Sequence, residues 1–208
     1  ALSVNESWRV FRIMAEIVEG IETLSNVHNA VTIFGSARVK PDDAYYQQTE
    51  KLAGLLVKEG FSVITGGGPG IMEAANKGAA EAGGKSVGLN IKLPYEQKPN
   101  PYANIRIEYK YFFVRKVMFV KYAVAYVIMP GGYGTMDEFF EALTLIQTRK
   151  TKPFPVILMG SEYWQGLINW LKNKMLKEDK ILPADLELIQ VIDEPEDVVK
   201  LIKKYVIV

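Results

Sequence analysis

Short apolar runs alternate with longer segments of helical period along this chain of 208 residues. Three of the runs end in glycine-rich turns, after Phe34, Thr65 and Met129. A repeat of buried strand and amphipathic helix at this spacing is typical of a parallel sheet with helices on both faces. In such a sheet a ligand binds beyond the carboxyl ends of the strands, where the strand order reverses. We therefore expect the site of this protein at the edge that the glycine turns mark.

The residue patterns predict an order of elements for the whole chain. An apolar stripe from Trp8 to Leu24 predicts a helix over 5–26, within an N-terminal extension of residues 1–29. In the core, residues 30–208, we predict strands at 30–34, 61–65, 86–91, 105–109, 124–129, 154–159 and 186–192. The predicted helices cover 42–59, 71–82, 112–122, 135–148, 163–176 and 194–205. The expected fold is a Rossmann-like α/β domain with a doubly wound parallel sheet, in which residues 1–208 form a single nucleotide-binding unit.

The composition argues against several classes of chemistry. The chain has no cysteine, which removes disulfides, thiolate catalysis and cysteine-ligated zinc. His28 is the one histidine, so a histidine-based metal site or a Ser-His-Asp triad is not expected. The net charge of +1 favours neither nucleic acid nor an acidic membrane surface as a partner. No apolar run approaches the roughly 20 residues that span a bilayer, and no signal peptide is recognisable. We expect a cytoplasmic protein that binds a small molecule without a metal.

The strongest functional pattern is Pro130-Gly131-Gly132-Tyr133-Gly134-Thr135-Met136-Asp137-Glu138, which directly follows the apolar run 123–129. Glycines let a backbone approach a ligand closely, and the free N–H groups at the start of a helix attract anions. Glu138 would then stand beside a bound phosphate. The pattern therefore indicates a phosphate site with an acidic side chain next to it.

Two residues of this region have alternative interpretations. Thr135-x-x-Glu138 also matches a capping box, in which two side chains satisfy backbone donors at a helix start, and a carboxylate used in that way is less free to act on a substrate. Arg115 lies beside Lys116 in a mostly apolar helix. It either reaches out to solvent or points into a site, where its guanidinium suits a phosphate or a carboxylate. The spacing leaves both questions open.

The turn Gly66–Gly70 differs from the dinucleotide fingerprint G-x-G-x-x-G, because Ile71 stands where the third glycine belongs. Its place at the same sheet edge favours contact with a nucleotide over a purely structural turn. We expect Ser36, Gly67 and Gly68, which follow the first two strands, to contact the substrate.

Together these motifs resemble those of the LOG family, the cytokinin riboside 5′-monophosphate phosphoribohydrolases, whose members were often labelled lysine decarboxylase. The resemblance covers about residues 30–175 and rests on Gly66–Met72, Arg115-Lys116-x-Met118 and Pro130–Glu138. The stretch Leu89–Gln97 resembles a bacterial branch with a longer N-terminal helix. Asp137 departs from the family pattern, which commonly has glutamate there, but the change is conservative.

The resemblance implies hydrolysis of the N-glycosidic bond of a nucleoside 5′-monophosphate, either AMP or a cytokinin riboside 5′-monophosphate, to free base and ribose 5-phosphate. It implies that Arg115 and Glu138 are catalytic, that no cofactor is needed, and that the site forms at the subunit interface of a homodimer or higher homo-oligomer. It also implies substrate contacts by Glu96, Lys116, Gly131, Gly132, Tyr133, Gly134 and Thr135.

Several roles stay open within that chemistry. Glu138 would stabilise the positive charge that develops on the ribose and orient the attacking water, as carboxylates do in other glycoside hydrolyses. Arg115 would bind phosphate, orient Glu138 or assist departure of the base. A second carboxylate, if one is used, is Glu96 or Asp137.

The alternative function is a carrier of the same fold, which binds a nucleotide or the molybdenum cofactor without cleaving it. The presence of both Arg115 and Glu138 favours the enzyme. The decarboxylase label has little chemical support, because pyridoxal phosphate chemistry needs a Schiff-base lysine and a partner for the ring nitrogen. No pattern in the sequence marks either.

Overall fold

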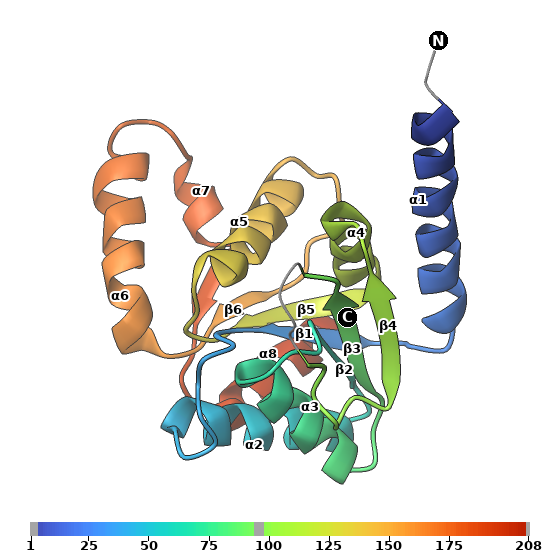
Figure 1. Cartoon of the computed structure of the whole chain (residues 1–208). Coiled ribbons are helices and arrows are strands. Elements are labelled where there is room, and N and C mark those ends of the chain that lie inside the picture. The colour runs from blue at the N-terminus through green and yellow to red at the C-terminus, as the bar shows by residue number, and fades with distance from the viewer. Residues whose placement is uncertain (1–3, 94–97, 207–208) are drawn as a thin grey trace.

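The computed structural model describes residues 4–93 and 98–206. Within them a parallel sheet of seven strands has the order β4-β3-β2-β1-β5-β6-β7 (Figure 1). The strands are β1 (Ala30–Phe34), β2 (Ser62–Thr65), β3 (Ser86–Ile91), β4 (Ile105–Tyr109), β5 (Ala123–Ile128), β6 (Val156–Leu158) and β7 (Ile189–Val191). Every neighbouring pair is parallel. The predicted Rossmann-like, doubly wound sheet is therefore confirmed.

The strand order reverses between β1 and β5. From β1 the chain adds β2, β3 and β4 on one side, and it then returns to the other side of β1 to add β5, β6 and β7. Phe34 and Ile128, the last residues of β1 and β5, are partners in the register. The turns that follow these two strands therefore start side by side, at the kind of switch point where open α/β sheets bind ligands.

Helices cover both faces of the sheet (Figure 1). One face carries α2 (Ala44–Lys58), α3 (Ile71–Glu81) and α8 (Pro195–Val206). The other carries α1 (Val4–Thr23), α4 (Phe112–Tyr122), α5 (Tyr133–Gln147) and α6 (Ser161–Trp170). Successive residues of a strand point to opposite faces. Val31 and Ile33 of β1 accordingly pack with α2, α3 and α8, and Ala30 and Phe34 pack with α1, α4, α5 and α6.

The predicted boundaries are least accurate near the C-terminus. The helix expected at 163–176 is α6 followed by a π-helical segment, η1 (Leu171–Leu176), and the strand expected at 186–192 is split into α7 (Pro183–Leu186) and the short β7. β6 covers Val156–Leu158 within the predicted 154–159, and it begins after Pro155, which has no N–H to donate. None of the helices that the structure describes combines the length and apolarity needed to span a membrane.

Candidate functional site

The turns after β1, β2 and β5 are joined through Ser36. Its N–H donates to the carbonyl of Pro130 at 2.9 Å, and its carbonyl accepts from the N–H of Ile71 at 3.0 Å. Gly70 allows this approach, because it has φ +69° and a Cβ at this position would lie 2.4 Å from the Ser36 carbonyl oxygen. The three turns therefore form one frame at the switch point.

A cavity of about 1260 Å³ opens at this frame. Most of the predicted site residues line it, namely Ser36, Gly68, Arg115, Gly131, Gly132, Tyr133, Gly134, Thr135 and Glu138. Two predicted residues, Gly67 and Lys116, lie outside the lining. Glu96 falls in the segment 94–97, outside the described residues, so its predicted contact stays a prediction.

The first turn of α5 presents free amides to the cavity. Gly132 is the N-cap of α5, and its carbonyl accepts from the N–H groups of Thr135 and Met136, both at 3.0 Å. The N–H groups of Gly132, Tyr133 and Gly134 find no acceptor among the described residues. Free amides at a helix start, together with the positive end of the helix dipole, form an anion-binding site.

The capping-box interpretation of Thr135 and Glu138 is wrong. It requires Thr135 to be the N-cap, whereas the helix begins two residues earlier at Tyr133, and no side chain caps it. The N–H of Thr135 is already bonded to Gly132, so the Glu138 carboxylate has no donor to satisfy there. Glu138 is therefore available to act on a ligand.

The carboxyl of Glu138 is buried in the cavity wall. The residue is 5% exposed, and its Oε2 has no hydrogen-bond partner among the described residues. Burial raises the pKa of Glu138 from 4.5 to about 7, against the opposing effect of the positive charges of Lys116 and Arg115. A carboxyl that titrates near neutral pH in a cleft is typical of a functional site.

Arg115 points into the cavity, which settles the second question that the sequence left open. Its guanidinium lies over the rings of Phe112 and Phe119, at 5.2 and 5.5 Å from their centroids. One terminal nitrogen is 3.5 Å from the Leu89 carbonyl, and Nε is buried without a partner among the described residues. Burial lowers the pKa of Arg115, and the negative charge of Glu138 opposes that shift. The guanidinium has donors left for a ligand.

Lys116 joins α4 to α5 instead of lining the cavity. Its Nζ lies 2.8 Å from a carboxylate oxygen of Asp137 and 2.6 Å from one of Glu141. Asp137, one of the two residues considered as a second carboxylate, is thus engaged with Lys116 and is also outside the cavity lining. In this arrangement Lys116 acts on the site through its charge, which lowers the pKa of Glu138.

Gly67 shapes the cavity wall from behind. It has φ +69°, and a Cβ there would lie 2.4 Å from Oδ1 of Asn90. Its carbonyl accepts from the N–H of Asn100 at 2.9 Å and from Nδ2 of Asn90 at 3.1 Å. Nδ2 of Asn100 donates to Oδ1 of the buried Asn76, which also accepts from the hydroxyl of Thr65. This buried network fixes the glycine turn after β2.

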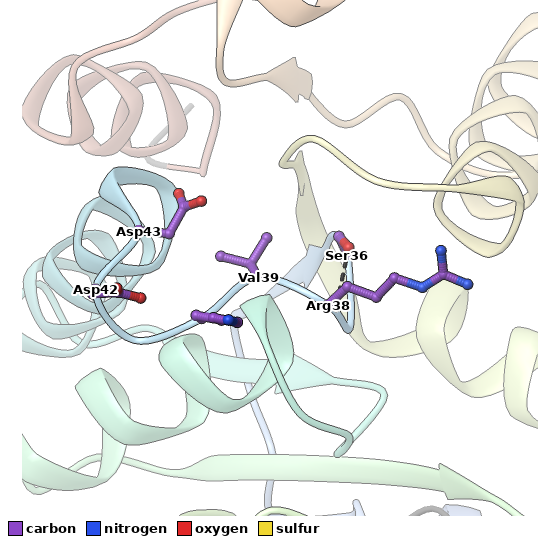
Figure 2. A pocket seen from close by; sticks show the side chains of 6 residues that line it. Ser36, Arg38, Val39, Asp42 and Asp43 are labelled. Carbon is purple, nitrogen blue, oxygen red and sulfur yellow. Dashed lines mark hydrogen bonds between the residues drawn. The ribbon is translucent and has the colours of Figure 1, made fainter.

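A shallower hollow of about 430 Å³ adjoins the cavity and shares Ser36, Arg38 and Val39 with it. Asp42 and Asp43, before the start of α2, line the far side of the hollow. Figure 2 shows the Arg38 side chain extending away from these two aspartates. Its backbone N–H donates to Oγ of Ser36 at 3.1 Å. Arg38 therefore adds a second cation to the wall of the main cavity.

Sequence reasoning missed several lining residues, among them Arg38, Met72, Asn90, Phe112 and Tyr163. Arg38 and Tyr163 follow the carboxyl ends of β1 and β6 closely, so the rule that located the glycine turns would have found them. The hydroxyl of Tyr163 donates to the Gly131 carbonyl at 2.7 Å and so supports the turn before α5. Phe112 starts α4, and no sequence signal distinguished it from a core aromatic residue.

The described residues contain no group of three or more acidic or histidine side chains placed to hold a metal ion. The polar groups of the cavity include free backbone amides, two guanidinium groups and one buried carboxyl. This set is suited to an anionic ligand that also presents a reacting centre to Glu138.

The fold and the cavity together define a Rossmann-like α/β protein with free amides at a helix start and a buried acid at its switch point. The family described as "Possible lysine decarboxylase" matches residues 72–202. Relatives carry the name cytokinin riboside 5′-monophosphate phosphoribohydrolase. The one from Mycobacterium tuberculosis is 28% identical over 153 residues, which is 72% of this chain and 81% of the relative. LOG3 of Arabidopsis thaliana is 23% identical over 192 residues, 90% of this chain and 88% of the relative. The chain therefore belongs to the LOG family, as its motifs predicted.

The solved structures that resemble this chain share its fold. A molybdenum cofactor binding protein from Rippkaea orientalis has a TM-score of 0.63 and 24% identity, and the match covers 86% of this chain and 97% of that chain. The molybdenum cofactor carrier protein of Chlamydomonas reinhardtii has a TM-score of 0.62 and 21% identity, and the match covers 87% of this chain and 99% of that chain. At these identities the likeness extends to the fold alone.

Proposed function

We propose that this protein hydrolyses the N-glycosidic bond of nucleoside 5′-monophosphates, AMP or a cytokinin riboside 5′-monophosphate, to the free base and ribose 5-phosphate. The observation that carries the proposal is the buried Glu138 carboxyl, unpartnered at Oε2, in the same cavity as the free amides of the first turn of α5. The named activity of the relatives supports the same reaction.

The charges of the cavity fit a phosphate ester. The amides of Gly132, Tyr133 and Gly134 provide donors for the 5′-phosphate, and the guanidinium groups of Arg38 and Arg115 add positive charge. With the phosphate at this helix start, the ribose lies toward Glu138, one turn further along α5. The apolar side chains of Met72, Ile91 and Phe112 then remain for the base.

In the reaction the bond between C1′ and the base nitrogen breaks, and its electron pair leaves with the base. Positive charge develops on the ribose ring, and the ionised carboxylate of Glu138 stabilises it and orients a water molecule toward C1′. The water supplies a hydroxyl group to C1′ and a proton to the base, so the products are neutral base and ribose 5-phosphate. The positive charges of Lys116 and Arg115 lower the pKa of Glu138 against the effect of its burial and so favour the ionised form.

We also propose that a second copy of the chain completes the mouth of the cavity. Tyr133 and Phe112, both at the cavity, are 96% and 51% exposed. Aromatic side chains with this exposure beside a ligand cavity are well suited to be covered by a partner.

A product assay tests the proposed reaction. Incubation with AMP, isopentenyl-AMP and a panel of other 5′-monophosphates is expected to release base and ribose 5-phosphate. The Glu138→Gln variant keeps the size of the side chain and is expected to bind AMP with near-normal affinity while turnover falls by at least a hundredfold. Full turnover in Glu138→Gln would remove Glu138 from the mechanism.

The same panel separates the enzyme from the carrier. No release of base from any monophosphate, together with tight binding of a nucleotide or of molybdenum cofactor, would replace the proposed hydrolysis with the carrier function. A nucleoside without its 5′-phosphate serves as the control for the anion site, and we expect it to bind and react poorly.

A further inference from the structure

Helix α1 has two apolar faces, and the molecule covers one of them. Ile13 and Ile17 pack against the core, Leu24 beyond the helix end is fully buried, and Gly20 lies close to the Tyr109 hydroxyl. On its outer side α1 exposes six large apolar side chains, each between 41 and 61% exposed: Trp8, Val10, Phe11, Met14, Val18 and Ile21. A surface helix needs one apolar stripe to pack on its own core. The outer stripe is not covered by the described part of the chain, so we expect another molecule to cover it.

The spacing of the outer stripe fits a helix as that partner. Phe11, Met14, Val18 and Ile21 follow one another at intervals of three, four and three residues. This is the spacing at which one helix interlocks with another along a narrow seam. Figure 1 shows α1 standing at the edge of the molecule beside α4 and β4, so its outer side is open to a second molecule.

Charges beside the seam select the direction of the partner helix. Arg12 and Glu19 are seven residues apart and therefore lie on the same flank of the seam, where Glu22 is also placed. None of these three side chains makes an ion pair or side-chain hydrogen bond with the part of the chain that the structure describes. A second α1 packed antiparallel would bring its Glu19 and Glu22 next to Arg12. In a parallel pair this flank would face the opposite flank of the second helix, so Arg12 would lie away from Glu19 and Glu22 of that copy.

We infer that α1 pairs with α1 of a second copy of this chain, antiparallel, about a twofold axis between Met14 and Val18. In this arrangement Met14 packs on Val18 of the second copy, Phe11 packs on its Ile21, and Arg12 forms an ion pair with its Glu19 or Glu22. A standard interface buries about 800 Å² on each partner. Six side chains of this size supply a large part of that area. The pairing does not depend on the proposed reaction.

A membrane surface fits the same stripe less well. Helices that lie on anionic lipid carry lysine and arginine on their polar face. The sequence of α1 holds two arginines and four glutamates, so its charge opposes such a surface. Binding to vesicles that contain phosphatidylserine, with no self-association, would overturn the pairing.

The first test disrupts the seam. The Met14→Glu/Val18→Glu variant changes only exposed side chains and leaves Ile13 and Ile17 in place. Light scattering of the full chain is expected to show half the mass of the unsubstituted protein at the same concentration, whatever assembly the cavity side forms. Tyr205→Glu, at an exposed aromatic residue of α8, is the control and keeps the full mass. An unchanged mass in the seam variant would overturn the proposal.

The second test uses the charges, which do not affect the fold of the subunit. Arg12→Glu alone, and Glu19→Arg/Glu22→Arg alone, each place like charges across an antiparallel seam, so each is expected to lose the pairing. An equimolar mixture of the two variants places opposite charges together again and is expected to recover the mass of the unsubstituted protein. If both variants assemble normally alone, the antiparallel arrangement is wrong.

Discussion

The carboxyl of Glu138 lies in the cavity wall with one oxygen unpartnered and a pKa of about 7. In the unfolded chain the same carboxyl has its ordinary pKa of about 4.5. The folded protein therefore holds its proton up to a higher pH than the unfolded chain does. Glu138 destabilises the fold wherever the unfolded carboxyl is ionised, and the protein tolerates this cost at a residue that its proposed reaction needs.

The pH dependence of stability gives the first prediction. Below pH 4.5 Glu138 is protonated in both the folded and the unfolded state, so it does not change the free energy of unfolding. As the pH rises toward 7, the unfolded chain loses this proton first and the folded state becomes less stable relative to it. Above pH 7 the full loss of stability is present. Glu138→Gln removes a cost on the order of 3 kcal/mol. The melting temperature of this variant should exceed that of the unsubstituted protein by several degrees at pH 8, and the gain should vanish near pH 4. An equal gain at both pH values would contradict the raised pKa.

Arg115 gives the second prediction. Arg115→Ala is expected to raise KM for AMP, lower kcat, and move the pH profile of the reaction to higher pH, because the positive charge that lowers the pKa of Glu138 is lost. Arg115→Lys is the matched control: it keeps a charge but not the planar fork, so it should restore the pH profile more than the rate. Steady-state kinetics of both variants between pH 5 and 9 measure KM, kcat and the pH profile. A pH profile that stays in place in Arg115→Ala would show that the two groups act independently.

At the scale of single elements, the start of α5 is where sequence and structure differ most instructively. Thr135-x-x-Glu138 carries the signature of a capping box, but Gly132 can serve as N-cap without a side chain, and the helix begins at Tyr133. The signature shows that Thr135 and Glu138 are able to cap a helix whose N-cap is Thr135. It does not determine at which residue the helix starts. The glycine turn, held by bonds from Ser36 and Tyr163, decides that start.

The first turn of α5 gives the third prediction. A Cβ on Gly131 would lie 2.1 Å from Oγ1 of Thr135, so Gly131→Ala must displace the turn that presents the free amides. Affinity for AMP and for ribose 5-phosphate is expected to fall at least tenfold, as measured by calorimetry. Gly134→Ala, in the same turn, is the control, because a Cβ there meets nothing within 4 Å. Equal losses in both variants would indicate that the turn is sensitive to any side chain.

Other elements were predictable only in part. The buried strands β1, β2 and β5 are mostly apolar runs that lead into glycine turns, and their predicted ranges are nearly correct. The π-helical segment Leu171–Leu176 follows α6 without a break, and no pattern in the sequence separates the two. The resemblance to the family implied that Lys116 contacts the substrate, yet consecutive residues of a helix point about 100° apart. Of Lys116 and its neighbour Arg115, only Arg115 lines the cavity.

At the scale of the whole molecule, the sheet edge was predictable and the wall of the cavity was not. The rule that ligands bind at the carboxyl ends of strands located the turns after β1, β2 and β5 from sequence. It said nothing of Phe112 or Phe119, because these reach the cavity through the way α4 packs on the sheet. Contacts between distant parts of the chain decide which side chains line a cavity.

Ligand-linked stability gives the fourth prediction. A ligand that binds the folded state alone at 100 times its Kd stabilises it by about 2.7 kcal/mol. For a chain of this size that corresponds to a rise in Tm of roughly 5–10 °C. AMP and ribose 5-phosphate should both produce it, and adenosine, which lacks the phosphate, should produce much less. Thermal scans with Glu138→Gln, which does not consume AMP, make the comparison direct. An equal rise in Tm with adenosine would show that the base, and not the phosphate, provides most of the binding free energy.

The bonds that join the three turns of the site come mainly from the backbone of Ser36, whose N–H and carbonyl hold Pro130 and Ile71. Backbone groups are the same in every amino acid, so the geometry of this junction does not depend on which side chains the surrounding loops carry. The walls can be altered residue by residue while the scaffold keeps its shape. Selection or design can therefore change which compound such a chain binds by altering the side chains of the cavity wall, while the fold and the junction of the turns stay the same.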